Sequence, residues 1–169
     1  MSEEPTKENI SRLLSKLPNN LTVVERVLLL YHGTVQTLLS IIFNYPVEIK
    51  VLSQLEYGGF IVRNSDLSCN GISVGIASSF INIKNIDKGM LNGLKEQRLG
   101  IGQLLSVTRH DNTTREIINV GVTNEYVWRT YSIKDASEFV DIVITEIFLR
   151  DIINGVDSRK YYLMDRQDG

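Results

Sequence analysis

The spacing of apolar residues first changes near Pro46. Before Pro46, apolar positions recur every three or four residues over residues 6–16, and again from Thr22 onward with Gly33 as the expected interruption. This spacing predicts amphipathic helices. After Pro46, residues 47–83 alternate in places between apolar and polar positions and are rich in Val, Ile and Ser, which predicts at least three antiparallel strands. The chain therefore begins with helices and continues as a sheet.

Short local motifs indicate where several of these elements begin or turn. Thr22 and Glu25 have the spacing of a capping box, in which each side chain accepts from the backbone amide of the other residue. Asn70–Gly71 is a dipeptide preferred in two-residue hairpin turns. Asp87 predicts the start of a short helix, and the "RLGIG" stretch, residues 98–102, predicts a glycine-bearing turn that leads into another.

The strand pattern returns in the second half of the chain, over "TREIINVGVTNEYVWRTYSI" and "EFVDIVITEIFL", and predicts two or three more strands. This order of elements predicts an α+β fold with an antiparallel β-sheet flanked by helices. We expect one domain over residues 1–169, because this length is typical of a single domain and no linker or repeat interrupts it. We expect residues 1–20 to form an N-terminal helix and extension, and residues 151–169 to form a polar tail.

The composition argues against several classes of function. The net charge is −2 and no long basic run is present, so a nucleic-acid partner is not expected. The single cysteine, Cys69, cannot form an internal disulfide, and no Cys/His spacing suits a metal site. The N-terminus is acidic and polar, unlike a signal peptide, and the most apolar stretch is too polar to span a membrane. We therefore expect a cytoplasmic protein without a metal ion or a membrane partner.

Three charged residues stand among apolar strand positions. Counting by twos places Glu146 on the same face as Ile142 and Ile144, where an ionised carboxylate is costly unless it is paired. Glu146 therefore marks an edge position, a structural ion pair, or a carboxylate inside a cavity. Arg63 and Arg129 each allow two interpretations. Either the aliphatic part of the side chain packs in the core while the guanidinium reaches water, or the planar guanidinium binds a ligand carboxylate.

The glycine turn at residues 98–102 adds a fourth candidate. It could expose backbone N–H groups at the start of a helix, an arrangement that suits an anion. It is not a dinucleotide-binding loop, because no strand closely precedes it and the glycine spacing differs. Two guanidinium groups, one carboxylate and this turn would together suit a small anion with an apolar body, but they do not name a reaction.

Several segments of the sequence follow the order and spacing of one known family. These segments are "LLLYHGTVQTLLSIIFNYPVEIKVLSQ", "VRNSDLSCNGISVGIASSFI", "RLGIGQLLS", "TREI", "YVWRTYSI" and "ITEIFL". Together, over roughly residues 24–149, they resemble the chorismate pyruvate-lyase family, and more closely its compact bacterial and archaeal branch, formerly a domain of unknown function. The sequence departs from this branch at His32, where an acidic residue is common before "GT".

The resemblance implies a cofactor-independent elimination that converts chorismate to 4-hydroxybenzoate and pyruvate in an internal cavity beneath helical flaps. It implies that Glu146 and Arg63 are the catalytic residues. The backbone amides of Leu99 and Gly100 would bind the ring carboxylate together with Arg63. Arg129 would bind the enolpyruvyl carboxylate, and Glu146 would contact the ring hydroxyl and assist proton transfer. No metal or cofactor is implied.

A different function remains open on the same fold, because effector-binding domains of some transcription regulators share it. The alternative is therefore a non-catalytic domain that binds or senses a small aromatic carboxylate. Only about 20 residues precede the predicted capping box, too few for a helix-turn-helix region. A structural homologue without activity is a third interpretation. An exposed edge strand could support a homodimer.

Overall fold

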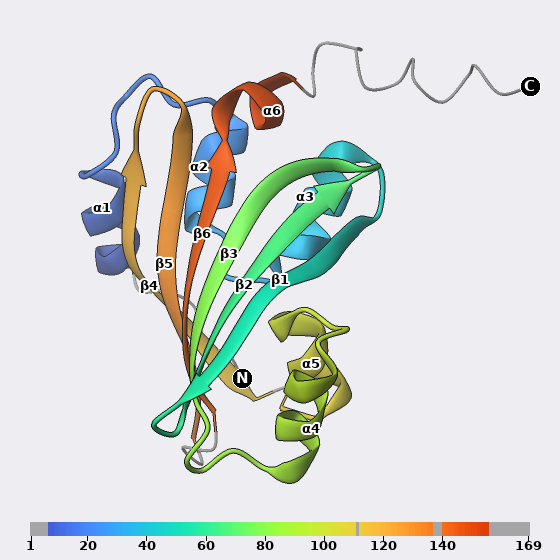
Figure 1. Cartoon of the computed structure of the whole chain (residues 1–169). Helices are drawn as coiled ribbons and strands as arrows, with labels where there is room; N and C mark the ends of the chain where they lie inside the picture. The colour runs from blue at the N-terminus through green and yellow to red at the C-terminus, as the bar shows by residue number, and fades with distance from the viewer. Residues whose placement is uncertain (1–6, 111, 137–139, 156–169) are drawn as a thin grey trace, which may run out of the picture.

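The computed structural model describes residues 7–110, 112–136 and 140–155 and consists of one six-stranded antiparallel sheet with helices. The strands run in the order β1-β2-β3-β6-β5-β4 (Figure 1). Their bounds are β1 Val47–Tyr57, β2 Phe60–Cys69, β3 Ile72–Asn82, β4 Thr113–Val122, β5 Tyr126–Asp135 and β6 Asp141–Leu149. The helices are α1 Lys7–Leu14, α2 Val23–Leu30, α3 Val35–Phe43, α4 Lys88–Glu96, α5 Ile101–Val107 and α6 Arg150–Asn154. The predicted α+β class is confirmed.

The two ends of the chain are only partly described. The N-terminal extension contains α1, and its residues 1–6 lie outside the described residues. The expected polar tail begins with a helix, because α6 continues directly from the end of β6. The rest of that tail, residues 156–169, also lies outside the described part of the chain.

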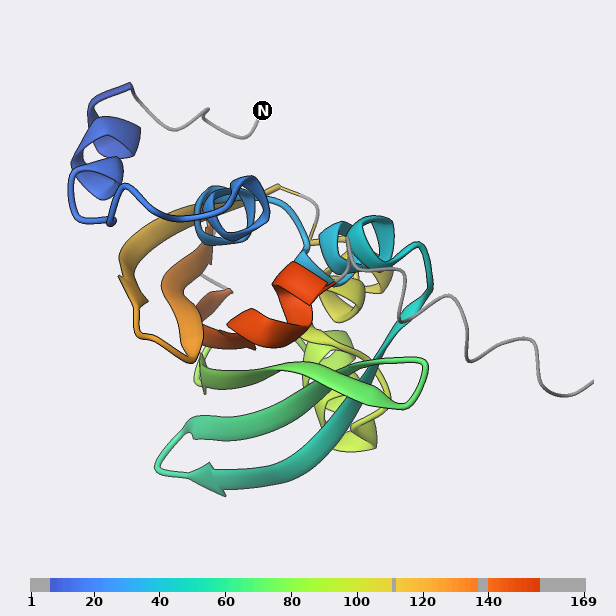
Figure 2. The same ribbon diagram turned by 90° about the horizontal axis from the view of Figure 1, so that it is seen from above.

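The sheet is strongly curved, and helices α2 to α6 gather on its concave side (Figure 2). Side chains on this side are buried: on β2, for example, every second residue from Ile61 to Cys69 is buried. Because side chains alternate between the two faces of a strand, the opposite face of the sheet points away from the helices. The concave side is therefore the core, and any buried site lies there.

Several local predictions are confirmed by the backbone. The Thr22 hydroxyl accepts from the Glu25 amide at 3.2 Å, and the Glu25 carboxylate accepts from the Thr22 amide at 2.8 Å, which is the predicted capping box. Asn70 and Gly71 have φ values of 49° and 77°, as a primed hairpin turn between β2 and β3 requires. Asp87 caps α4 by accepting from two backbone amides.

The helical break near Gly33 was predicted, but it begins earlier than expected. Helix α2 ends at Leu30, and Tyr31 is already extended, with φ −72° and ψ 127°. A Cβ atom at Gly33 would lie 2.3 Å from the Tyr31 hydroxyl oxygen, so the tyrosine ring fills the space beside this glycine. The early end of the helix matters for the site, because it frees the Tyr31 carbonyl to accept from a buried arginine of the sheet.

Candidate functional site

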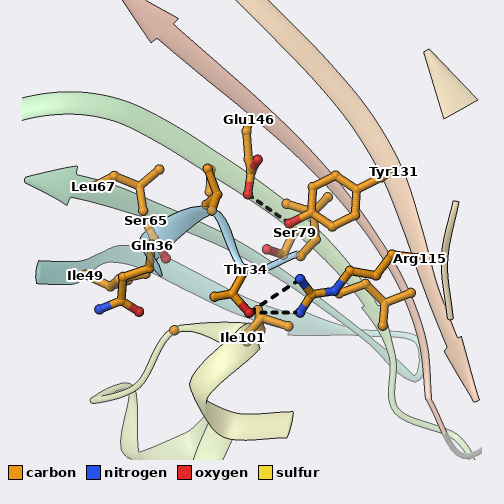
Figure 3. Close-up of a pocket in the computed structure, with 16 residues that line it drawn as sticks. Thr34, Gln36, Ile49, Ser65, Leu67, Ser79, Ile101, Arg115, Tyr131 and Glu146 are labelled. Atoms are coloured by element: carbon orange, nitrogen blue, oxygen red, sulfur yellow. Dashed lines mark hydrogen bonds between the residues drawn. The ribbon is translucent and has the colours of Figure 1, made fainter. Parts of the chain in front are cut away.

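A cavity of about 40 Å³ lies between the concave face of the sheet and the first turns of α3 and α5 (Figure 3). All six strands contribute to its wall, which is largely apolar on the β1, β2 and β3 side. Its polar and charged side chains are Thr34, Gln36, Ser65, Ser79, Arg115, Tyr131 and Glu146. The cavity therefore combines an apolar surface with a few convergent polar groups, as small-molecule sites usually do.

The cavity is small for an organic ligand. A protein cavity that holds a benzene ring measures about 150 Å³, so a ligand with an aromatic ring requires side chains around the cavity to move. An open depression of about 450 Å³ lies beside it and shares Thr34, Gln36 and Gly102 with its lining. The shared residues place the shortest route to the cavity between α3 and α5.

Glu146 is both an ion-pair partner and part of the cavity wall. It lies on β6, the central strand between β3 and β5, and it is 2% exposed. One carboxylate oxygen accepts from Arg129 Nε at 2.7 Å, and the other accepts from the Tyr131 hydroxyl at 2.8 Å. The central strand excludes the edge interpretation. The other two interpretations of this residue, a structural ion pair and a carboxylate in a cavity, both describe it correctly.

Arg129 is held away from the cavity by its own partners. It is 1% exposed, stands directly opposite Glu146 in the β5–β6 register, and also donates from Nη1 to the Tyr31 carbonyl. Its guanidinium lies 5.0 Å from the centre of the Tyr131 ring, and it does not line the cavity. Its implied role as a ligand-binding residue therefore stays a prediction that would require these contacts to exchange.

Tyr131 is a hydroxyl donor that the sequence did not single out. Burial raises its pKa well above the ordinary value, and the nearby Glu146 carboxylate raises it further. The phenol therefore stays protonated at neutral pH and donates to Glu146. The sequence shows that Tyr131 and Arg129 are two residues apart and so share one face of β5. It does not show that Glu146 lies opposite this strand.

Arg63 is a buried cation for which the described residues provide no acidic partner. It is 1% exposed and donates from Nη2 to the Leu99 carbonyl, while Nε and Nη1 have no hydrogen-bond partner. Burial lowers its pKa. Arg63 is not itself part of the cavity lining, but its same-face neighbour Ser65 and its cross-strand partner Ser79 are. The guanidinium therefore lies behind the cavity wall, under the Leu99–Gly100 turn.

The glycine turn is present, but two of its backbone groups already have partners. The Leu99 carbonyl accepts from Arg63, and the Gly100 amide donates to Gln103 Oε1 at 3.1 Å. A Cβ atom at Gly100 would lie 2.6 Å from Ile49 Cδ1, so glycine allows the turn to approach β1 closely. A ligand carboxylate would have to displace Gln103 to reach the Gly100 amide. The implied ligand contact of this amide therefore stays a prediction.

Arg115 is the charged group at the cavity that the sequence did not identify. It lines the cavity from β4, is partly buried, and donates from both terminal nitrogens to the Thr34 hydroxyl at 3.4 Å (Figure 3). Within the described residues no carboxylate lies within ion-pair distance of it. It belongs to the "TREI" segment, whose alternating polar residues are equally typical of a solvated strand.

No group of three or more His, Cys, Asp or Glu side chains among the described residues is arranged to hold a metal ion. None of their helices is both long and apolar enough to cross a membrane.

The fold and the cavity together define a class: a curved antiparallel sheet whose concave face and covering helices enclose a small polar-lined site. No protein-family model matches the sequence, and no curated protein sequence matches it significantly. Solved structures do match this arrangement of elements.

Two of these structures come from one protein. PhnF from Mycobacterium smegmatis matches with a TM-score of 0.52 at 10% identity, over 72% of this chain and 66% of that chain. The effector domain of PhnF alone matches with a TM-score of 0.52 at 9% identity, over 73% of this chain and 92% of that chain. The chain thus spans slightly less than two thirds of the longer PhnF structure and nearly all of its effector domain. At this identity the likeness concerns the fold, which agrees with the fold expected from the sequence.

Proposed function

We propose that this chain is a binding domain for a small organic carboxylate with an aromatic body, held in the cavity beneath α3 and α5. The observation that carries the proposal is Arg63, a guanidinium 1% exposed whose Nε and Nη1 lack partners. Buried charges in proteins are normally paired, because an unpaired one carries the full cost of leaving water. Arg63 lies behind the cavity wall, so side chains of the wall must move before a ligand carboxylate reaches it. The carboxylate then supplies the missing charge, and its two oxygens match the planar fork of arginine.

The remainder of the cavity suits the body of such a ligand. Leu67, Ile133 and Ile144 provide an apolar wall for a ring. The Glu146–Tyr131 pair lies on the same wall and offers oxygen acceptors and a hydroxyl for a ring substituent. A hydroxyl-bearing aromatic acid such as 4-hydroxybenzoate combines these features, and it is the probe that the resemblance to the lyase family also suggests.

A non-catalytic role is supported by the kind of structure that matches. One of the two matched structures is an effector domain, and the chain covers 92% of it. Both oxygens of Glu146 already accept hydrogen bonds within the fold. These bonds fix the position of the carboxylate, which can then serve as an acceptor for a ligand hydroxyl. Binding requires only such positioning, with no proton transfer.

The test is a pair of ligands that differ only in charge. Calorimetric titration of the protein with 4-hydroxybenzoate and with 4-hydroxybenzamide should show binding of the acid and little binding of the amide. The Arg63→Met variant should no longer bind 4-hydroxybenzoate. Arg98→Met changes an exposed arginine of the nearby turn and should bind it as the unmodified protein does. Equal binding of acid and amide, or no binding of any small aromatic acid by the folded protein, would contradict the proposal.

Chorismate elimination is the second candidate, favoured by a carboxylate and a protonated phenol that meet on one cavity wall. In this mechanism Arg63 holds the ring carboxylate, and Glu146 accepts a hydrogen bond from the ring hydroxyl. The ring C–O bond to the enolpyruvyl group breaks, the ring loses a C–H proton with the assistance of Glu146, and the released enolpyruvate takes up a proton to become pyruvate. Positioning contributes much of the rate, because the product ring is aromatic. Incubation with chorismate should then release 4-hydroxybenzoate and pyruvate in equal amounts above the spontaneous rate. Binding of the aromatic acid without such release assigns the chain to the binding role.

A further inference from the structure

Polar atoms without a partner gather at one pair of neighbouring residues in the core. Among the described residues, four buried side-chain nitrogen or oxygen atoms lack a hydrogen-bond partner, and three of them belong to Arg63 and Gln54. These are Nε and Nη1 of Arg63, which are donors, and Oε1 of Gln54, which is an acceptor. Folded proteins leave few such atoms, so three in one place indicate a partner from outside the chain.

The pairing of β1 with β2 brings these two residues together. Gln54 is the register partner of Arg63, and directly opposite residues project from the same face of a sheet with Cβ atoms about 5 Å apart. Both side chains reach the backbone of α4 and of the turn that follows it. Gln54 Nε2 donates to the Leu94 carbonyl at 2.9 Å, and Arg63 Nη2 donates to the Leu99 carbonyl.

The bond to Leu94 fixes the orientation of the Gln54 amide. Because a carbonyl can only accept, the nitrogen of the amide faces Leu94 and the oxygen is the free atom. Gln54 Oε1 therefore presents an acceptor beside a guanidinium whose own free atoms are donors. A ligand that satisfies both residues must offer acceptors to Arg63 and a donor to Gln54. A carboxylate meets only the first requirement, because it has no hydrogen to donate.

We propose that Gln54 determines the specificity of this site by accepting a hydrogen bond from an amino group next to the ligand carboxylate. The amino group stands on the ring carbon adjacent to the one that carries the carboxylate, so the ligand class is the ortho-aminobenzoates. The inference rests on the proposed function, because it takes Arg63 as the residue that binds the carboxylate. The carboxylate then meets Nε and Nη1 of Arg63, and the amino group donates to Gln54 Oε1.

An amino group suits this position better than a hydroxyl group does. A hydroxyl next to a carboxylate has one hydrogen, and that hydrogen bonds to the carboxylate within the ligand itself. An amino group has two hydrogens, so one can bond to the carboxylate of the ligand while the other reaches Gln54. The free acceptor of Gln54 therefore selects for the amine.

The charge of the site favours a neutral aromatic amine over the ammonium group of an α-amino acid. Arg63 is a buried cation, 1% exposed, and Gln54 carries no charge. No ion pair between described residues includes Arg63, so an ammonium beside it would meet a like charge without compensation. An aromatic amine is uncharged at neutral pH and adds the donor without a second positive charge.

The first test compares three ligands on the unmodified protein by calorimetric titration: 4-hydroxybenzoate, 2-amino-4-hydroxybenzoate and 3-amino-4-hydroxybenzoate. The two amino compounds are isomers, and only the first places its amino group beside the carboxylate. It should bind about tenfold more tightly than 4-hydroxybenzoate, because it gives a buried acceptor its missing donor. The 3-amino isomer should show no such gain. This comparison does not depend on the folding of any variant.

A pair of variants then assigns the gain to one side chain. Gln54→Met removes the acceptor, so the 2-amino compound should bind no more tightly to it than 4-hydroxybenzoate does. Gln97→Met is the matched control, because it removes the same amide from an exposed position at the end of α4. This control should keep the full difference between the two ligands.

The contrary outcomes separate this inference from the proposed function. Binding of 4-hydroxybenzoate without a gain for the 2-amino compound overturns the role of Gln54 and leaves the proposed function standing; a buried water is then the partner of Gln54 Oε1. A gain that Gln54→Met retains assigns the amino group to another acceptor and also overturns the inference. If none of the three acids binds the folded protein, the proposed function fails and the inference fails with it.

Discussion

Glu146 and Arg63 lie on neighbouring parts of the same buried face, yet their charges are in different situations. Both oxygens of Glu146 accept from donors on β5, so its charge is satisfied inside the fold. Two donor nitrogens of Arg63 have no partner. A charge satisfied within the fold contributes to structure, whereas an unsatisfied one lowers stability until a ligand completes it. The two residues should therefore respond in opposite ways to substitution.

The Arg63→Met variant should be more stable than the unmodified protein. The substitution removes an unpaired buried charge and keeps a side chain of similar length, which should raise the free energy of unfolding by about 1 to 3 kcal/mol. Urea denaturation measures this difference. A loss of stability of similar size would mean that Arg63 serves the fold through its bond to the Leu99 carbonyl, and would remove it from the ligand site.

The Arg129→Met variant should be strongly destabilised, because it leaves the Glu146 carboxylate buried without its cation. Breaking one partner of a buried pair costs about 3 to 5 kcal/mol. Adding Glu146→Gln to Arg129→Met should recover part of that cost, since the remaining group is then uncharged. A double-mutant cycle measured by urea denaturation tests this. Additive effects of the two substitutions would show that the ion pair contributes no coupling.

Helices α2 and α6 are joined by a buried carboxylate. Glu25 is 0% exposed and accepts from Arg150 Nε at 2.6 Å and from Asn154 Nδ2 at 2.9 Å, in addition to its role in the capping box. Burial acts to raise the pKa of Glu25, but the hydrogen bonds from Arg150, Asn154 and Thr22 outweigh it and hold the pKa below the ordinary value of 4.5. The link between the first helices and the end of β6 is therefore sensitive to acid.

The stability that Glu25 contributes should depend on pH in a defined direction. Because its pKa is lowered on folding, the contribution is fully present above pH 4.5, the ordinary value, and is lost as the pH falls through the lower pKa of the folded state. The free energy of unfolding of the unmodified protein should therefore exceed that of Glu25→Gln at pH 6, and the gap should narrow toward pH 3. A gap that stays constant over this range would contradict the assignment.

The route between α3 and α5 can be narrowed by one methyl group. A Cβ atom at Gly102 would lie 2.8 Å from Thr34 Cγ2 and 3.2 Å from Thr34 Oγ1. Gly102→Ala should therefore slow the association of an aromatic acid, measured by stopped-flow. Thr34→Ser in the same chain removes the closer of the two atoms and should restore part of the rate. An unchanged association rate in Gly102→Ala would place the route elsewhere.

The sequence predicted those parts of the fold and site that depend on neighbours along the chain. The Thr22–Glu25 cap, the Asn70–Gly71 turn and the alternation that exposed Glu146 as unusual are all local patterns. The partners of Glu146 were not predictable, because the pairing of β5 with β6 is a contact between separate strands. Arg115 was missed for the same reason: only the curvature of the whole sheet brings β4 beside α3.

At the scale of the whole molecule, the sheet separates two surfaces with different properties. Its concave side encloses the cavity, with Arg63 and Arg115 as cations that lack an acidic partner among the described residues. Its convex side carries exposed apolar side chains, among them Val62, Ile76 and Phe80. The two surfaces lie on opposite sides of the sheet, so substitutions on the convex side should leave ligand binding unchanged.

A variant on the convex side should therefore still bind ligand. Ile147→Lys should bind 4-hydroxybenzoate with the affinity of the unmodified protein, because Ile147 points away from the cavity that its neighbour Glu146 lines. Calorimetric titration of both proteins at matched concentration checks this. A large loss of affinity in a variant that remains folded would show that the two sides of the sheet are coupled.

The role of Arg63 can be tested directly through the nuclear magnetic resonance signal of its Nε–H group, assigned by its disappearance in Arg63→Lys. This donor has no partner in the fold, and a ligand carboxylate should become its acceptor. Saturation with 4-hydroxybenzoate should move the signal strongly downfield, and 4-hydroxybenzamide should leave it unchanged. If the acid binds while the Arg63 signal stays in place, the carboxylate is held elsewhere and the account of this site is wrong.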